Sequence, residues 1–131
     1  MLKFVYGVLP AWIVQSDNMP DFAVGNTVAM VIKMRADYMA SDAVVKHELV
    51  HVKQFYRTLG LHSILYGAVA RYRLYSEAEA YAVQIGEHAS EWDIMWAVDS
   101  LAANYNLPMS KAYIQNYFLQ KLHTLFGRLM P

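Results

Sequence analysis

The chain has 131 residues, of which 56% are hydrophobic and 17% are charged, and its formal net charge is zero. This length suits a single core, so one domain is expected over residues 1–131. The composition excludes a disordered chain. The absence of a basic block predicts that the protein does not bind nucleic acid. The chain has no cysteine, which excludes disulfides, thiolate zinc sites and a cysteine nucleophile.

The amino-terminal residues carry a weak targeting signal. Residues 1–15 faintly resemble a signal peptide, but Pro10 interrupts their apolar run and no small-residue cleavage site follows. No apolar run approaches the roughly 18 residues of a membrane span. With no cysteine and no convincing signal peptide, the sequence slightly favours a cytoplasmic location, and it leaves the oligomeric state unknown.

Short strands are predicted near the amino terminus. Residues 3–8 and 11–16 are rich in β-branched and aromatic side chains, and Gly7 and Pro10 interrupt them. The segment Thr27–Lys33 is nearly all apolar and is the best strand candidate in the chain. We expect this strand to be covered on both faces, or to receive a ligand along one edge.

A helix is predicted over about residues 42–59. Ser41 or Asp42 can cap its first backbone N–H groups, and Gly60 is a natural end. The apolar residues between them recur at helical spacing and form one broad stripe.

Three further helices are predicted after this one. They run from Ser63 to about His88, from Ser90 to near Asn104, and from Ser110 or Pro108 through apolar residues that extend to Leu129. The expected fold is therefore α+β but mostly α, with small antiparallel amino-terminal strands followed by about four helices.

The predicted helix 42–59 contains the motif His-Glu-x-x-His, at His47, Glu48 and His51. Residues four apart lie one turn above each other on a helix, so the two histidines can point at the same spot. Two imidazoles held in this way can share one Zn²⁺ at about 2.0–2.1 Å. Glu48 can then take a proton from a water on the metal without being a ligand itself.

A catalytic zinc site commonly has a third protein ligand. The metzincin pattern would place glycine at position 54 and histidine at position 57, but this chain has Gln54 and Arg57. The alternative is a carboxylate from a later helix, and the chain offers Glu77 and Glu79.

These two glutamates lie roughly 200° apart on a helix, so only one of them can face the metal. The stripe that contains Glu77 also contains Leu74, Ala78, Tyr81 and Ile85. The stripe that contains Glu79 also contains Tyr75, Ala82, Val83 and Gly86. Both stripes look buried, and periodicity leans to Glu77 as the third ligand with Glu79 as the runner-up.

The combination of His47-Glu48-x-x-His51 with a later Glu77-x-x-Ala80 resembles the gluzincin group of zinc metallopeptidases. It is similar in particular to the short members called minigluzincins. The resemblance implies one Zn²⁺ per chain, held by His47, His51 and Glu77. It also implies that Glu48 is the general base in the hydrolysis of peptide bonds.

The resemblance covers roughly residues 26–88 and implies a zincin-like domain. It would make Thr27–Lys33 the edge strand that binds a peptide or protein substrate as an added strand. Gluzincins often carry an acid directly after the alanine, where this chain has Tyr81.

The sequence supports two hypotheses about function. The first is a zinc metallopeptidase, active or latent, for which no oxyanion donor is identified among the candidates His62, Arg71, Tyr72, Tyr75 and Tyr81. The second is a catalytically silent, zincin-like protein that keeps zinc for stability or for partner recognition.

Overall fold

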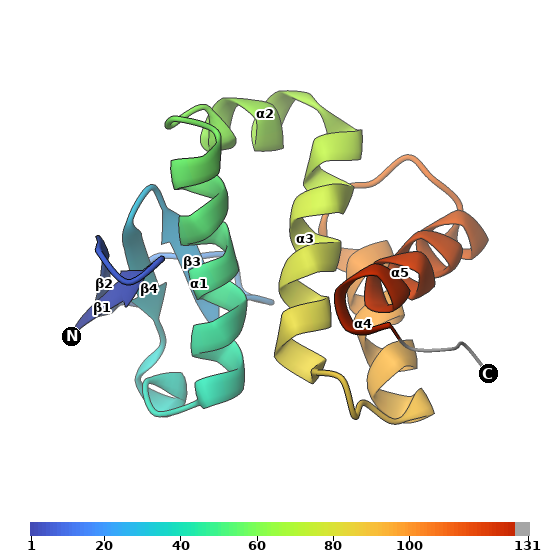
Figure 1. Cartoon of the computed structure of the whole chain (residues 1–131), viewed down its shortest axis with the longest axis horizontal. Coiled ribbons are helices and arrows are strands. Elements are labelled where there is room, and N and C mark those ends of the chain that lie inside the picture. The colour runs from blue at the N-terminus through green and yellow to red at the C-terminus, as the bar shows by residue number, and fades with distance from the viewer. Residues whose placement is uncertain (128–131) are drawn as a thin grey trace. The chain divides into compact units, whose positions relative to one another are not determined.

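The computed structural model describes residues 1–127. Within these residues there are four strands and five α-helices, which confirms the α+β, mostly helical class (Figure 1). The chain divides into two compact units, the first covering Met1–Leu65 and the second beginning at Tyr66. The expectation of a single zincin-like domain over residues 1–131 stays a prediction.

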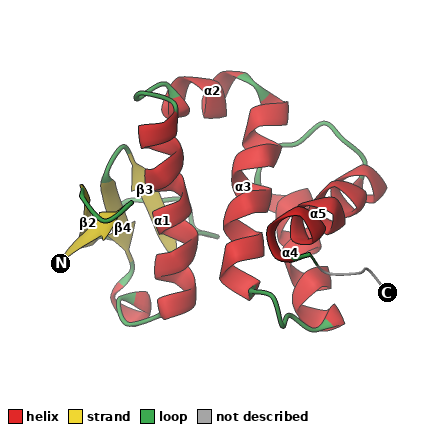
Figure 2. Ribbon diagram, viewed as in Figure 1, coloured by secondary structure: helices red, strands yellow, loops and turns green. Residues whose placement is uncertain are grey.

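The first unit contains the whole sheet and the motif helix (Figure 2). Its elements are β1 (Leu2–Val5), β2 (Leu9–Gln15), β3 (Gly25–Val28), β4 (Val31–Met34), a 3₁₀ turn (Ala36–Tyr38) and α1 (Asp42–Arg57). The helix α2 (His62–Ala68) follows across the boundary between the units. The second unit contains α3 (Ala70–Ile85), α4 (Glu91–Asn104) and α5 (Lys111–Phe126).

The strands form one sheet in the order β1-β2-β4-β3. β1 pairs with β2 and β3 pairs with β4 in antiparallel fashion, whereas β2 and β4 are parallel. The prediction of antiparallel strands is therefore confirmed for the two outer pairs, whereas it was wrong for the central pair. After β2 the chain first forms β3 and then returns as β4, which brings β4 alongside β2 in the same direction.

The predicted strand Thr27–Lys33 is two strands rather than one. The chain turns at Ala29, whose φ of 55° lies in the left-handed region, so β3 and β4 form a hairpin. Only one face of this hairpin is covered, because Ile32 is buried while Val28 is 52% exposed. β3 lies at the edge of the sheet and β4 lies inside it.

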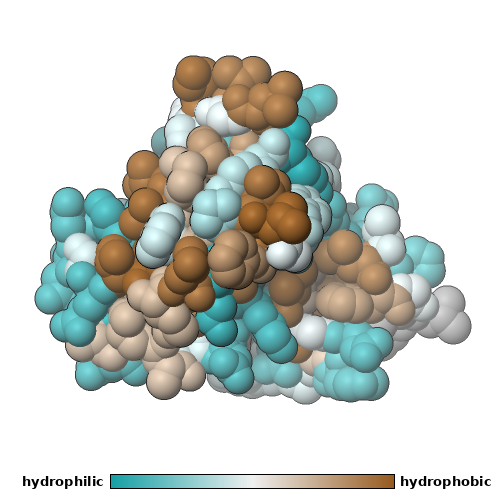
Figure 3. All heavy atoms as spheres, turned by 60° about the vertical axis from the view of Figure 1, so that its left-hand side comes forward, coloured by the Kyte–Doolittle hydropathy of each residue, from teal (hydrophilic) through white to brown (hydrophobic). Residues whose placement is uncertain are grey.

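Alternation along the strands divides the sheet into a buried face and an exposed face. The buried face contributes Val5, Ala11, Ile13, Ile32 and Met34 to a core that also includes Val44, Val45 and Val52 of α1. The exposed face is also rich in apolar side chains. Figure 3 shows hydrophobic residues in brown among hydrophilic ones at the molecular surface. Its exposed members are Leu2, Phe4, Trp12, Val14 and Val28.

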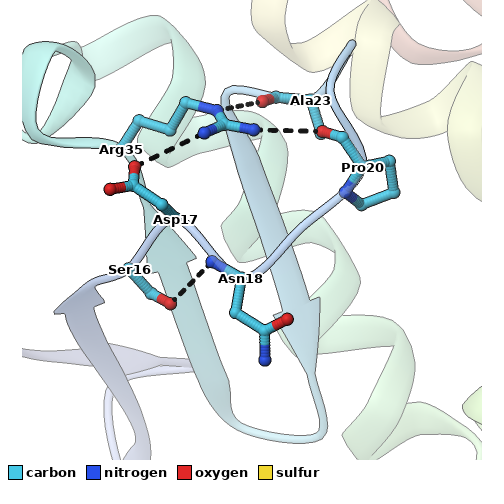
Figure 4. Close-up of polar contacts among 6 residues, drawn as sticks. All are labelled: Ser16, Asp17, Asn18, Pro20, Ala23 and Arg35. Carbon is cyan, nitrogen blue, oxygen red and sulfur yellow. Dashed lines mark hydrogen bonds and ion pairs between the residues drawn. The ribbon is translucent and has the colours of Figure 1, made fainter.

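The side chain of Arg35 fixes the loop between β2 and β3 (Figure 4). Its Nε donates to the carbonyl of Ala23 at 2.8 Å, its Nη2 to the carbonyl of Pro20 at 3.2 Å, and its Nη1 to Asp17 Oδ1 at 3.4 Å. The guanidinium group suits this role because its donors form a rigid planar fork. The loop leads directly into β3, so Arg35 helps to place the strand that faces the motif helix.

The motif helix agrees with the prediction to within two residues. Ser41 is its N-cap, accepting a hydrogen bond from the Val44 N–H at 3.4 Å, and the helix ends at Arg57. Leu59 and Gly60 follow with positive φ angles of 52° and 87°, which ends the helical path.

The second unit is a helical core. The segment predicted as one helix from Ser63 to about His88, with an irregular start around Gly67, is two helices, α2 and α3, that are separated at Val69. α4 begins after Ser90, which forms a capping box with Asp93 of the first turn, and it ends at Asn104, as predicted. α5 begins after Ser110, while Leu129 lies outside the described residues.

The buried apolar residues of the second unit come from all three of its long helices. Leu74 of α3, Leu101 of α4 and Phe118 of α5 are each at most 1% exposed and belong to one core cluster. Within residues 1–127, none of the helices combines the length and apolar character needed to cross a membrane.

Replacing Arg35 with methionine should lower the stability of the protein. The substitution keeps the aliphatic stem but removes the donors to Ala23 and Pro20, which should cost about 1–2 kcal/mol of unfolding free energy. Chemical denaturation monitored by circular dichroism measures this change. Asp17→Asn is the control, because its side chain is 84% exposed and exposed ion pairs contribute little. Equal stabilities of Arg35→Met and the parent would contradict the assigned role.

Candidate metal centre

The two histidines of the motif lie on one face of α1, as the spacing predicts. His47 and His51 are 7% and 6% exposed, respectively. Their ring centroids are 5.2 Å apart and their planes are inclined by 72°. Two buried imidazoles at this separation provide nitrogen ligands from a rigid element, which is what a metal site needs.

A hydrogen bond orients the His51 ring. Its Nδ1 lies 3.0 Å from Oε1 of Gln54, one turn further along α1. Because an amide oxygen only accepts, this contact favours the tautomer with the proton on Nδ1 and leaves Nε2 as the metal-binding nitrogen. Gln54, which is 1% exposed, therefore acts as an outer partner of a candidate ligand.

Glu48 faces the edge strand β3 within the first unit. The Thr27 hydroxyl donates to Glu48 Oε2 at 2.6 Å and also lies 3.3 Å from the Glu48 carbonyl oxygen. The carboxylate also packs against Gly25, where an added Cβ would lie 2.9 Å from Glu48 Oε1. A larger residue at position 25 would therefore displace the Glu48 side chain, and the strand as it stands holds Glu48 in one orientation.

Glu77 lies on α3 and is 4% exposed. The hydroxyl of Tyr66, at the end of α2, donates to Glu77 Oε1 at 2.6 Å. A short hydrogen bond to an ionised acceptor is among the stronger kinds in proteins. The carboxylate is therefore held in place by its own unit.

Glu79, the runner-up ligand, has different partners. Its Oε2 accepts a hydrogen bond from the Tyr75 hydroxyl at 3.3 Å and lies 3.5 Å from Nζ of Lys121. The same ammonium group lies 4.4 Å from the centroid of the Tyr75 ring. Burial raises the pKa of the neighbouring Tyr117, and the charge of Glu79 adds to that shift. Glu79 thus forms an ion pair inside the helical unit.

Within the described residues, one group of side chains could hold a metal ion, namely His47, His51 and Glu77. Each residue offers one candidate ligand atom, and these three atoms all lie within 4.8 Å of one another. All three side chains are buried. Two imidazole nitrogens and one carboxylate oxygen match the donor set of catalytic zinc sites, which leaves a fourth position for water or substrate. The residues present therefore fit a metal ion.

Tyr81 occupies the position where gluzincins often have an acid. Its hydroxyl lies 2.8 Å from that of Tyr105. Burial raises the pKa of Tyr105, and the nearby Glu77 carboxylate raises it further. Tyr105 therefore stays neutral, and it supplies a polar group near Glu77 without adding a charge.

Sequence reasoning did not find the hydroxyl partners of the two glutamates. Thr27 lies on β3 and Glu48 on α1, while Tyr66 lies on α2 and Glu77 on α3, so spacing within a single helix connects neither pair. His62, interpreted from the sequence as a surface or core histidine, is 6% exposed and lies 5.8 Å from His51 between ring centroids.

Comparisons of the chain with protein-family models, with curated proteins and with solved structures gave no match. The resemblance to gluzincins therefore stands on the residues of this chain alone.

The two glutamates provide a matched pair of variants. Glu77→Gln should weaken Zn²⁺ binding by more than the roughly 10–100-fold that loss of an outer partner typically costs, because a ligand itself is removed. Glu79→Gln should bind Zn²⁺ like the parent. Competition with a chromogenic chelator measures both affinities. The reverse ranking would assign the third ligand to Glu79 instead.

Proposed function

We propose that this protein is a zinc-dependent metallopeptidase of the gluzincin kind. In this proposal His47, His51 and Glu77 hold one Zn²⁺ per chain, and Glu48 is the general base in peptide-bond hydrolysis. The observation that carries the proposal is the buried group of His47, His51 and Glu77, in which the two histidines share the helix α1 with Glu48.

When bound, zinc would polarise the scissile carbonyl and make a water more acidic. Glu48 is suited to accept a proton from that water and to return it to the leaving amine. The Thr27 hydrogen bond and the contact with Gly25 restrict the Glu48 carboxylate to one orientation. The carboxylate would therefore need little reorientation during the reaction.

The proposed substrate is an extended peptide or protein segment that pairs with β3. Because β3 is an edge strand, its outward backbone groups are available for strand addition. Thr27, which contacts Glu48, lies on the same strand. The pairing of the substrate with β3 and the orientation of Glu48 would thus depend on the same strand.

A metal site without turnover is the second candidate function. It is favoured by the deep burial of the ligands, since His47, His51 and Glu77 are all at most 7% exposed. A closed, buried site is typical of structural zinc. Such a protein would lose thermal stability when zinc is removed and would cleave no peptide in a broad library.

Glu48→Gln separates the two functions. The variant should keep its zinc, because Glu48 is not a ligand, while peptide cleavage should fall by about 10²–10⁴-fold with loss of the general base. Cleavage of a peptide library is measured beside the zinc content of the same samples. An unchanged cleavage rate would remove the general-base role, and a parent that cleaves nothing would favour the second function.

Thr27→Val should lower kcat while it leaves KM and zinc content nearly unchanged. Valine keeps the branched shape and suits a strand, but it cannot donate a hydrogen bond to Glu48. Thr27→Ser is the matched control, because it retains the hydroxyl and should recover most of the lost kcat. A Val variant as fast as the parent, or a Ser variant as slow as the Val variant, would contradict the role of this hydrogen bond.

A further inference from the structure

Glu77 belongs to a network of polar contacts inside the helical unit. The Tyr66 hydroxyl donates to Glu77 Oε1 at 2.6 Å. This donor restricts rotation of the carboxylate and thereby fixes where its second oxygen points. Ligating carboxylates in metal sites are commonly held by such outer hydrogen bonds.

The backbone beside Tyr66 is itself fixed by Arg73. The guanidinium group donates to the Tyr66 carbonyl from Nη1 at 2.8 Å, to the Tyr105 carbonyl from Nε at 2.7 Å and to the Asn106 carbonyl from Nη2 at 2.9 Å. One side chain of α3 thus joins the end of α2 to the segment after α4. A rigid planar fork of donors can reach several separated carbonyls at once, whereas the donors of a lysine all lie on one nitrogen.

The residues that Arg73 connects also surround Glu77. Tyr66 contacts the carboxylate directly, and the charge of Glu77 contributes to the raised pKa of Tyr105. The position of Arg73 on α3, one turn before Glu77, places this clamp on the same rigid element as the candidate ligand. Movement of the Tyr66 backbone away from α3 would require the Arg73 contact with its carbonyl to break or stretch.

We propose that Tyr66 is a positioning residue for the third metal ligand and that Arg73 acts through Tyr66, so that both determine how tightly the site binds metal. This inference rests on the proposed metal site. It goes beyond that proposal because it assigns a function to two residues outside the His-Glu-x-x-His…Glu pattern.

Zinc affinity of the metal-free protein, measured by competition with a chromogenic chelator, tests the role of Tyr66. Tyr66→Phe keeps the ring but removes the donor, and should weaken Zn²⁺ binding by about 10–100-fold. Tyr72→Phe is the matched control, since this tyrosine also lies near the start of α3 but packs against Tyr75, and it should bind like the parent. Parent-like affinity of Tyr66→Phe would overturn the inference.

A double-mutant cycle separates positioning from a general loss of stability. In a Glu77→Gln background, Tyr66→Phe should cause little further loss of zinc affinity, because its effect passes through the Glu77 carboxylate. If the losses of zinc-binding free energy in the two single variants add in full in the double variant, the positioning role is overturned. Co²⁺ spectra give a second readout, since a reoriented carboxylate should alter the visible bands of Tyr66→Phe but not those of Tyr72→Phe.

Arg73→Lys tests the second step of the proposal. Arg73→Lys should also weaken Zn²⁺ binding. The double variant with Tyr66→Phe should bind Zn²⁺ at most a few-fold more weakly than Tyr66→Phe alone. Full additivity would overturn the assignment of Arg73 to this role. If Arg73→Lys does not fold, as judged by thermal denaturation without metal, Arg73→Gln, which keeps a planar N–H₂ donor, takes its place in the same cycle.

The outcome for the parent protein distinguishes the two levels of the proposal. A parent that binds no Zn²⁺ overturns the metal site and this inference together. A parent that binds one Zn²⁺ while Tyr66→Phe matches it overturns only the role of Tyr66.

Discussion

Burial of carboxylates is the constraint on which this structure depends. An isolated buried charge costs roughly several kcal/mol of folding free energy unless hydrogen bonds or opposite charges compensate for it. In the described chain each buried glutamate receives a hydrogen bond from a hydroxyl group that its own unit supplies. The pairs are Thr27 with Glu48, Tyr66 with Glu77, and Tyr75 with Glu79. These hydroxyl groups hold the carboxylates in fixed orientations without adding a charged donor.

The surroundings of Glu77 and Glu79 differ in a way that indicates their roles. Glu79 lies beside the ammonium group of Lys121, so its charge contributes to the packing of α3 against α5. Glu77 instead belongs with His47 and His51 to the group that could hold a metal ion. Two acids separated by one residue on the same helix thus face different environments, as the period of a helix requires.

Much of the helical structure could be predicted because its signals are local. Serine caps and helical spacing of apolar residues placed α1 and α4 to within about two residues. The position of His47 and His51 on one face of α1 follows from the same helical period of about 3.6 residues per turn. These features need only residues that are a few positions apart.

Features that depend on tertiary contacts could not be predicted in this way. The split of the Thr27–Lys33 segment depends on a left-handed turn at Ala29, a residue type that gives no turn signal. The parallel pairing of β2 with β4 depends on where β3 inserts in the sheet. The hydroxyl partners of Glu48 and Glu77 lie on other elements than the glutamates themselves, so residue type alone could not reveal them.

The central claim is that His47, His51 and Glu77 hold one metal ion. Anomalous X-ray diffraction, recorded above and below the zinc absorption edge from crystals of the zinc-loaded protein, tests this most directly. The account predicts one anomalous peak per chain, at about 2.0–2.2 Å from one nitrogen of each histidine and one oxygen of Glu77. Density that shows these three side chains ordered with no peak between them, or a peak bound by Glu79 instead, would contradict it.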